Sequence, residues 1–286
     1  MILIKNKSET QSEGHNMKTA VITGAASGLG KAIAMKYARE NWQIIVADIQ
    51  DEAGKAVVDE INQLGAKAYY YHCDISRVAD FEALADFTET TTGACHFLAN
   101  NAGIASTGSL METDEAEWER MISLDLMSCI RGSKAFIPLL MKSATAQEPT
   151  AIVNTASFAG IALMPGMMSY NVTKAGVIAF SETLRAELFQ HNIHVGVACP
   201  SFFKTNLTDS MTSADDATIA RVTRWMENSG VTADTVAEDI FNAVRDGEFL
   251  ILTHKETKKF YKMSRWFPKF MQKKKNTIKS IGTTKN

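Results

Sequence analysis

Strand-like and helix-like segments alternate along most of this chain, and this alternation restricts the possible fold more than any other feature. Short runs rich in β-branched and aromatic residues begin with KTAVIT at residues 18–23 and end near Leu252. Amphipathic stretches of helical length separate them. Strands that alternate with helices pair in parallel through right-handed crossovers. The sequence therefore predicts an α/β fold, with one doubly wound domain over residues 17–254.

The pattern also sets approximate limits for each element. The expected strands span residues 18–23, 42–48, 66–74, 96–99, 151–155, 193–198 and 248–252, which gives a parallel seven-stranded sheet. The expected helices span residues 31–40, 50–64, 78–91, 114–141, about 170–190 and 232–246. In the long helix 114–141, Met121, Ile122 and Leu124 are expected to face the core. Residues 201–230 suggest a partly helical lid, with a surface helical hairpin as the alternative.

The composition argues against several classes of protein, including nucleic-acid-binding, secreted and metal-binding proteins. The 286 residues carry a formal net charge of −2, but residues 255–286 alone hold eleven Lys and Arg side chains against one Glu. Only this tail is basic, so we expect no nucleic-acid partner. Residues 1–16 are polar and lack the apolar run of a signal peptide, which predicts a disordered extension and a cytoplasmic protein. The widely spaced Cys73, Cys95, Cys129 and Cys199 predict buried, reduced thiols rather than a metal site.

Residues 149–174 contain the strongest candidate for chemistry. Tyr170 and Lys174 are four residues apart, so on a helix the phenol and the ammonium would share one face. Ser157 follows the strand expected at residues 151–155. A membrane span is the alternative for this apolar stretch, but polar residues and glycines interrupt it.

Lys174 would make Tyr170 a useful acid or base at neutral pH. A free tyrosine has a pKa of about 10. A lysine charge ~4 Å away, at an effective dielectric of ~20, favours the phenolate by roughly 4 kcal/mol. That stabilisation would lower the pKa by about three units, to near 7. Ser157 would hold a carbonyl oxygen by a hydrogen bond.

A glycine-rich turn separates the first strand from the first helix. Residues 24–30 read GAASGLG, and such a turn brings backbone N–H groups against a pyrophosphate at a helix N-terminus. An ordinary tight turn is the alternative. Asp48 ends the second strand, where a carboxylate accepts from the adenosine ribose hydroxyls. It would repel a 2′-phosphate, and neither Ser27 nor Ile49 supplies a cation, so the sequence favours NAD over NADP. Alternatively, Asp48 caps the helix 50–64.

These features occur in one order with NNAG at residues 100–103 and YNVTK at residues 170–174. Over about residues 17–254, the chain resembles the short-chain dehydrogenase/reductase family. The resemblance implies a Rossmann-type fold with strand order 3-2-1-4-5-6-7 and catalytic roles for Ser157, Tyr170 and Lys174. It implies cofactor contacts at Gly24, Ser27, Gly28, Leu29, Gly30, Asp48, Ile49, Asp74, Ile75, Asn101, Ala102, Gly103, Tyr170, Lys174, Pro200, Phe203 and Thr205.

The chain departs from the family pattern at two positions. The family usually has Asn where Asp125 stands, seven residues after Trp118. An Asn both donates and accepts hydrogen bonds, whereas an ionised Asp only accepts. Asp125 is therefore a fourth candidate catalytic residue whose part in a proton relay through Lys174 is open. The milder departure is Ser201, where the family usually has Gly.

We therefore expect an NAD(H)-dependent oxidoreductase that interconverts an apolar alcohol and its carbonyl compound, as a homodimer or homotetramer. A non-catalytic NAD-binding sensor or scaffold is the alternative. Seven mainly apolar residues fall where the family builds its substrate pocket, which predicts an apolar, adaptable site. Alternatively, several of them make core or dimer contacts. The seven residues are Leu163, Met164, Met167, Met168, Phe202, Phe203 and Met211.

The tail from residue 255 to 286 has an amphipathic pattern as well as a basic one. Its apolar residues Phe260, Met263, Trp266, Phe267 and Phe270 fall near one helical face. Such a segment lies in a membrane interface, packs on the pocket mouth or a neighbouring subunit, or remains disordered. A proline at position 268 argues against one continuous helix.

Overall fold

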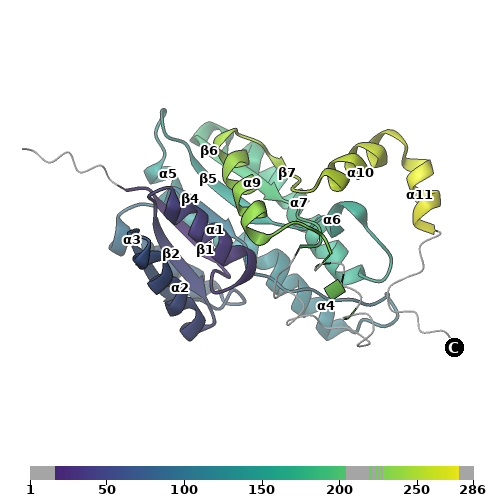
Figure 1. The fold of residues 1–286 in the computed structure, drawn as a ribbon, viewed down its shortest axis with the longest axis horizontal. Helices are drawn as coiled ribbons and strands as arrows, with labels where there is room; N and C mark the ends of the chain where they lie inside the picture. The colour runs from purple at the N-terminus through teal and green to yellow at the C-terminus, as the bar shows by residue number, and fades with distance from the viewer. Residues whose placement is uncertain (1–16, 204–219, 221–222, 225, 227, 277–286) are drawn as a thin grey trace, which may run out of the picture.

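Seven parallel strands form one sheet in the computed structural model, which describes residues 17–203, 220, 223–224, 226 and 228–276 (Figure 1). In chain order the elements are β1 (Thr19–Thr23), α1 (Gly28–Arg39), β2 (Gln43–Asp48), α2 (Asp51–Gln63), β3 (Ala68–His72), α3 (Val78–Thr92), β4 (Phe97–Asn100), α4 (Glu115–Met121), the π-helical η1 (Ile122–Met127), α5 (Ser128–Ser143), β5 (Thr150–Thr155), α6 (Ala159–Ala162), α7 (Met168–Leu188), the 3-10 turn η2 (Phe189–His191), β6 (Ile193–Ala198), α9 (Ala233–Arg245), β7 (Leu250–Ile251), α10 (Lys255–Trp266) and α11 (Pro268–Asn276). Within these residues, no helix is long and apolar enough to cross a membrane.

The strand order is β3-β2-β1-β4-β5-β6-β7, as expected from the sequence. The order reverses at β1, which pairs in parallel with β2 on one side and with β4 on the other. In an open parallel sheet, ligands bind beyond the carboxyl ends of the strands at such a reversal. The strand order therefore predicts that a ligand would bind at the loops after β1, β4 and β5.

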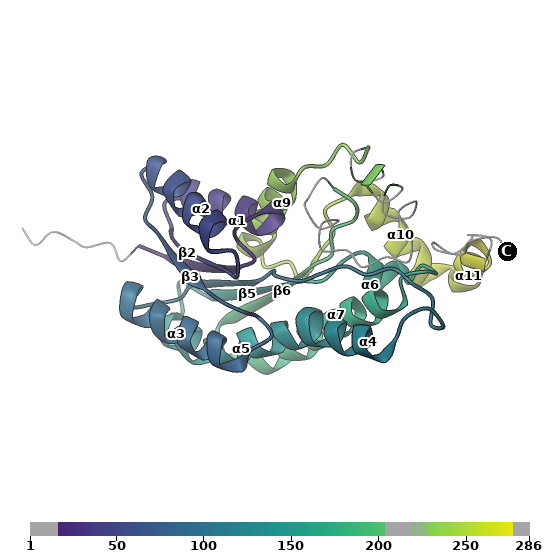
Figure 2. The ribbon, with the colours of Figure 1, turned by 90° about the horizontal axis from the view of Figure 1, so that it is seen from below.

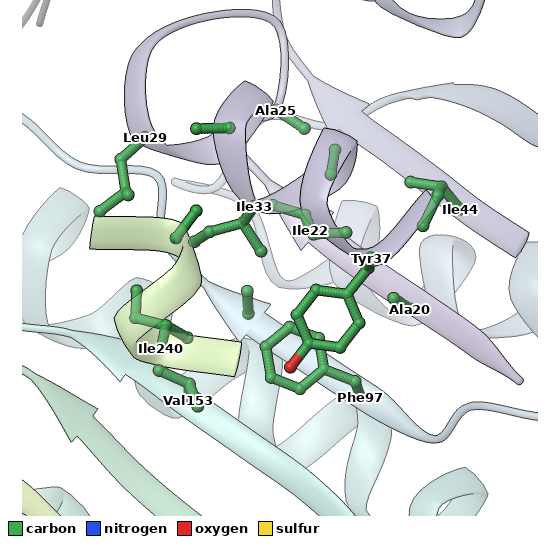
Figure 3. Packing of buried hydrophobic residues seen from close by; sticks show 14 of the residues in the cluster. Ala20, Ile22, Ala25, Leu29, Ile33, Tyr37, Ile44, Phe97, Val153 and Ile240 are labelled. Carbon is green, nitrogen blue, oxygen red and sulfur yellow. The ribbon is translucent and has the colours of Figure 1, made fainter. Parts of the chain in front are cut away.

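Helices cover both faces of the sheet. Figure 2 shows α1, α2 and α9 on one face and α3, α5 and α7 on the other. All five residues of β1 are buried between these two layers. On the α1 face, the ring of Tyr37 stacks on Phe97 with centroids 4.2 Å apart (Figure 3). This packing fixes α1, and with it the glycine-rich turn, against the middle of the sheet.

The predicted helix over residues 114–141 is interrupted. It consists of α4, the π-helical segment η1 and α5. A π-helical turn accommodates more residues than an α-helical turn, so side chains after it face different directions from those of a continuous α-helix. The expectation that Ile122 is buried was wrong, since it is 38% exposed. Asp125 is buried instead, and its carboxylate faces the interior.

The structure also bears on the predictions for the four thiols and for the two ends of the chain. The four cysteines are free and buried, as predicted. The expected extension 1–16 and most of the expected lid, including Thr205 and Met211, lie outside the described residues. The tail forms α10 and α11, which are separated at Phe267, directly before Pro268.

Candidate active site

Tyr170 and Lys174 lie one turn apart on α7, and both side chains are buried. The Lys174 Nζ atom is 5.6 Å from the centroid of the Tyr170 ring. It donates a hydrogen bond of 3.2 Å to the carbonyl oxygen of Thr155, at the end of β5. Ser157, just beyond β5, lies beside Tyr170, and its side chain acts to lower the pKa of the phenol. The structure therefore brings the three predicted side chains together at one strand end.

Asp125 forms a buried ion pair with Lys174. Its Oδ1 atom lies 3.5 Å from Lys174 Nζ, and the two side chains are 0% and 5% exposed. Asp125 Oδ1 also accepts from the backbone N–H of Ile104 at 2.9 Å, and Oδ2 accepts from the Thr173 hydroxyl at 3.3 Å. Because a buried charge is costly unless it is paired and hydrogen-bonded, these contacts explain how an acidic residue is accommodated there.

The surroundings of Tyr170 change the expected acidity of the phenol. Burial raises the pKa of Tyr170, Lys174 opposes that effect, and the negative charge of Asp125 raises the pKa further. The net direction is upward, so the expectation that Lys174 alone brings the pKa near 7 was wrong. Burial also raises the pKa of Asp125, although Lys174 opposes this. For Lys174, burial lowers the pKa, but nearby Asp125 and Tyr170 outweigh it and raise the net value.

Loop contacts set the start of α7. The backbone N–H of Gly108 donates to the carbonyl of Gly166 at 2.9 Å, and the N–H of Met168 donates to the carbonyl of Gly108 at 3.1 Å. The Asn171 side chain donates to the carbonyl of Met164 at 2.7 Å. These bonds connect the segment after β4 with the loop before α7 and hold Tyr170 at a fixed depth.

The glycine-rich turn is packed closely against the loop after β4. Gly24 has a φ of +68°, and a Cβ atom there would lie 2.9 Å from Ala102 Cα. A Cβ atom on Gly30 would lie 2.0 Å from the carbonyl oxygen of Gly24. α1 begins at Gly28, and its N-cap Ser27 makes no side-chain capping bond. The first amides of a helix lack intrahelical acceptors, so this turn has the donors that a phosphate group requires.

Gly103 connects the glycine-rich turn to the Lys174 site. A Cβ atom on Gly103 would lie 2.7 Å from Asp125 Oδ1 and 3.3 Å from Lys174 Nζ. Its neighbour Ala102 is the residue that contacts Gly24. A short series of contacts thus joins the candidate acid/base pair to the candidate cofactor turn.

Three threonines that no sequence motif singled out support this arrangement. The Thr23 hydroxyl accepts from the backbone N–H groups of Asn101 and Ala102 at 3.0 and 3.1 Å. The Thr155 hydroxyl donates to Asn101 Oδ1 at 3.3 Å. Thr173 donates to Asp125, as described above. Their positions in the sequence could have indicated this role, because each threonine directly precedes or lies within a motif segment. Thr23, for example, directly precedes Gly24.

Asp48 holds the glycine-rich turn from the neighbouring strand. Its Oδ2 atom accepts from the N–H of Ala26 at 2.9 Å, and its Oδ1 atom accepts from the N–H of Gln50 at 3.0 Å. The alternative role as cap of α2 is not observed, because the N-cap of α2 is Gln50. The next residue, Ile49, is exposed beside this turn.

A groove lies next to Ile49 at the β3 edge of the sheet. Its volume is about 600 Å³, and it is lined by Ile49, Tyr71, His72, Asp74, Arg77, Asp80 and Ala83. Asp74 Oδ1 accepts from the N–H of Ser76 at 2.9 Å, and this backbone bond lowers the pKa of Asp74. The carbonyl of Ile75 accepts from Arg131 at 3.2 Å.

The predicted pocket residues divide into two groups. Met167 packs with Tyr170 in one buried cluster, and Phe203 packs in the core with α1 and α9. Leu163 and Met168 are exposed. The Pro200 carbonyl accepts from the N–H of Phe158 at 2.8 Å, next to Ser157. The core alternative thus holds for Met167 and Phe203, while Leu163 and Met168 remain available to a substrate.

The sequence matches the family described as short chain dehydrogenase over residues 18–216. A relative named CLA biosynthesis dehydrogenase/reductase, from Lactiplantibacillus plantarum, is 30% identical over 84% of this chain and 88% of its own length. A cyclohexanol dehydrogenase from Acinetobacter sp. (strain SE19) is 34% identical over 70% of this chain and 78% of its own length.

A solved structure has the same fold along nearly the whole chain. It is a short chain dehydrogenase/reductase from Burkholderia phymatum in complex with NAD, with a TM-score of 0.82 and 28% identity. The match covers 94% of this chain and 98% of that chain. Together with the sequence matches, it identifies the chain as an oxidoreductase that belongs to the short-chain dehydrogenase/reductase family.

Proposed function

We propose that this protein is an NAD(H)-dependent oxidoreductase that interconverts an apolar alcohol and its carbonyl compound. The observation that carries the proposal is the grouping of Ser157 with the buried side chains of Tyr170 and Lys174 beside the glycine-rich turn. The cyclohexanol dehydrogenase relative supports an alcohol or carbonyl substrate.

The proposed chemistry centres on one proton. In carbonyl reduction, the Tyr170 hydroxyl donates its proton to the substrate oxygen, and in alcohol oxidation the phenolate accepts it. Ser157 holds the same oxygen by a hydrogen bond. Lys174 stabilises the phenolate while its own position is fixed by Asp125 and by the Thr155 carbonyl. When bound, a nicotinamide cofactor supplies the hydride acceptor or donor.

The residues around the glycine-rich turn fit a dinucleotide. Gly24 and Gly30 lie where an added Cβ atom would collide with neighbouring backbone, so the turn is shaped for close approach. The N-terminal amides of α1, from Gly28 to Gly30, would bind the pyrophosphate. In this proposal Asn101 and Gly103 support the nicotinamide end, and Ile49 and Asp74 border the groove at the adenine end.

We assign the cofactor preference to Asp48. Its carboxylate lies at the end of β2 and would accept from ribose hydroxyls while repelling a 2′-phosphate. Each tenfold preference corresponds to ~1.4 kcal/mol, and like-charge contacts in a binding site cost several kcal/mol. We therefore expect kcat/KM with NAD to exceed that with NADP by about a hundredfold or more. Asp48→Asn should reduce the ratio, because the amide removes the negative charge but keeps one accepting oxygen.

The proposal also covers the assembly and the location of the protein. We expect a homodimer or homotetramer in the cytoplasm. Exposed Ile122 and Val172 on the adjacent elements η1 and α7 support a subunit contact on that face. Size-exclusion chromatography with light scattering would test the assembly, and a monomer would contradict it.

Absorbance of the reduced cofactor would test the proposed function directly. Purified protein would be mixed with NAD and a panel of cyclic, linear and aromatic alcohols, and with NADH and the matching ketones and aldehydes. Turnover with at least one apolar pair, lost in Tyr170→Phe, would support the proposal. An NAD-dependent rise in melting temperature without turnover on any pair would favour a cofactor-binding sensor or scaffold instead.

A further inference from the structure

The C-terminal helices α10 and α11 extend from the catalytic domain beyond β7 (Figure 1). The start of α10 is firmly attached to that domain. The His254 ring, just before the helix, is within hydrogen-bond distance of the Phe202 carbonyl at 3.1 Å. The Phe260 ring meets Phe158 edge to face, with centroids 5.2 Å apart. Tyr261 packs against the apolar cluster that contains Val177.

The far end of this extension exposes three aromatic side chains. Trp266, Phe267 and Phe270 are 79%, 57% and 58% exposed. They occupy the corner where α10 ends and α11 begins. Met271 is buried, so α11 has an inner side that packs and an outer side that does not. We call the three aromatic residues, together with Lys262, Arg265 and Lys269, the aromatic–basic corner.

The charge around this corner opposes that of the remaining chain. Residues 255–276 contain nine Lys and Arg side chains and one Glu, a formal charge of +8. The whole chain carries −2, so the other residues carry −10 in total. An anionic partner is therefore attracted to the corner. A second copy presenting the same corner would be repelled by like charge.

Because Trp and Phe lie beside Lys and Arg, the chemistry favours a lipid surface over other anionic partners. Interfacial segments insert aromatic rings at the boundary between headgroups and acyl chains, while adjacent cations attract anionic headgroups. No helix among the described residues is long and apolar enough to span a bilayer, so the contact would be peripheral. We propose that the aromatic–basic corner docks this protein on anionic membranes, with Trp266, Phe267 and Phe270 inserted into the interface.

The attachment of α10 gives this docking a consequence for the candidate site. Phe260 contacts Phe158, the residue after Ser157. A docked corner would therefore hold the candidate site near the bilayer, where apolar substrates concentrate. This consequence, unlike the docking itself, rests on the function proposed above.

Vesicle co-sedimentation of the full-length protein would test the docking. Vesicles of equimolar phosphatidylcholine and phosphatidylglycerol would be compared with phosphatidylcholine alone. One variant would combine Trp266→Ser, Phe267→Ser and Phe270→Ser, and another would combine Lys262→Gln, Arg265→Gln and Lys269→Gln. Phe189→Ser is the matched control, because Phe189 is equally exposed at 80% but lies in η2, outside the tail.

We expect the wild type and the Phe189 variant to bind the anionic vesicles and not the neutral ones. Both corner variants should bind these vesicles at least about tenfold more weakly than the wild type. The basic variant loses three cations, each of which contributes ~1 kcal/mol near an anionic surface, roughly a fivefold change. The aromatic variant loses the rings that insert into the interface. Equal binding by the aromatic variant, or no binding by the wild type at low salt, would overturn the proposal. So would binding that a short single-stranded DNA matches and competes away, because that result indicates a nucleic-acid surface.

Two further measurements distinguish a failure of membrane docking from misfolding of a variant and from a failure of the proposed function. Circular dichroism melting would show that each variant is folded. Turnover of a water-soluble alcohol, measured without vesicles, should be the same in all variants, so its absence would count against the proposed function and not against docking. Loss of that turnover or of the oligomer in the corner variants would instead favour subunit or pocket packing and overturn the docking proposal.

Discussion

Two pairs of an aromatic ring and a lysine, each four residues apart on one helix, lie in opposite surroundings. On α7 the pair is Tyr170 and Lys174, and both side chains are buried. On α10 the pair is Lys262 and Trp266, and the indole is exposed. The spacing places each pair on one helix face. Since the spacing is the same, we expect the difference in burial to decide what each pair does.

The two environments treat a positive charge differently. The buried Lys174 requires compensation, which Asp125 and the Thr155 carbonyl provide. In return, the charge interacts strongly with the neighbouring phenol because little water screens it. The exposed cations of α10 are solvated, and added salt screens their interactions beyond about 10 Å. The first pair is suited to moving a proton, and the second to long-range attraction of an anionic surface.

Removing the buried phenol should give the largest effect. Tyr170→Phe keeps the ring but lacks the proton donor, so kcat should fall by ~10²–10⁴-fold while the cofactor still binds. Steady-state kinetics and isothermal titration with NAD would measure the two quantities. A variant that retains more than about a tenth of the wild-type kcat would show that Tyr170 is not the acid/base.

Removing the compensating carboxylate should reduce stability strongly. Asp125→Leu leaves the Lys174 charge buried without its partner, and such losses cost about 3–5 kcal/mol in the free energy of unfolding. The control is Lys142→Met, which removes an exposed ion pair with Glu89 and should cost less than about 1 kcal/mol. Urea unfolding would measure both variants. A similar cost for the two would mean that burial does not distinguish these pairs.

A milder change at the same position should shift the pH dependence. Asp125→Asn removes a negative charge that raises the pKa of Tyr170, so that pKa should fall. Alcohol oxidation needs the phenolate, so its rate should rise at a lower pH than in the wild type. Carbonyl reduction needs the phenol and should decline at a correspondingly lower pH.

The pH profiles of kcat in both directions would show this shift. Titration of the tyrosinate absorbance in the cofactor-free protein, with Tyr170→Phe as the blank, would report the same pKa without turnover. Profiles that stay in place or move upward would show that Asp125 does not act on the phenol through its charge.

The exposed lysine should give the smallest effect. Lys262→Gln should leave turnover of a water-soluble alcohol unchanged, because solvent already compensates the charge. Its binding to anionic vesicles should weaken by roughly fivefold, the value of ~1 kcal/mol for one cation. Parallel turnover and vesicle assays would separate the two. A marked fall in turnover would show that the α10 pair is not independent of the catalytic domain.

The sequence predicted the fold well because local patterns determine it. Alternating strands and helices indicated a parallel sheet, and the family resemblance implied its strand order. The ends of those strands bring the loops near Gly24, Asn101 and Ser157 to one edge. The burial of Asp125 and its ion pair with Lys174 could not be predicted in the same way, because they depend on the π-helical segment and on tertiary contacts. The expected pKa of Tyr170 was wrong because the burial of the phenol and, to a smaller extent, the nearby charge of Asp125 both result from the tertiary fold.

The strand order has a further consequence for synthesis of the chain. β1 pairs with β2, which follows soon after it, but its other neighbour is β4, at residues 97–100. During translation, β1 therefore has one unpaired edge until β4 has been made. The strand is buried along its full length in the finished fold, and an apolar strand with an open edge readily pairs with other chains. Early folding intermediates of this protein should depend on chaperones to protect that edge.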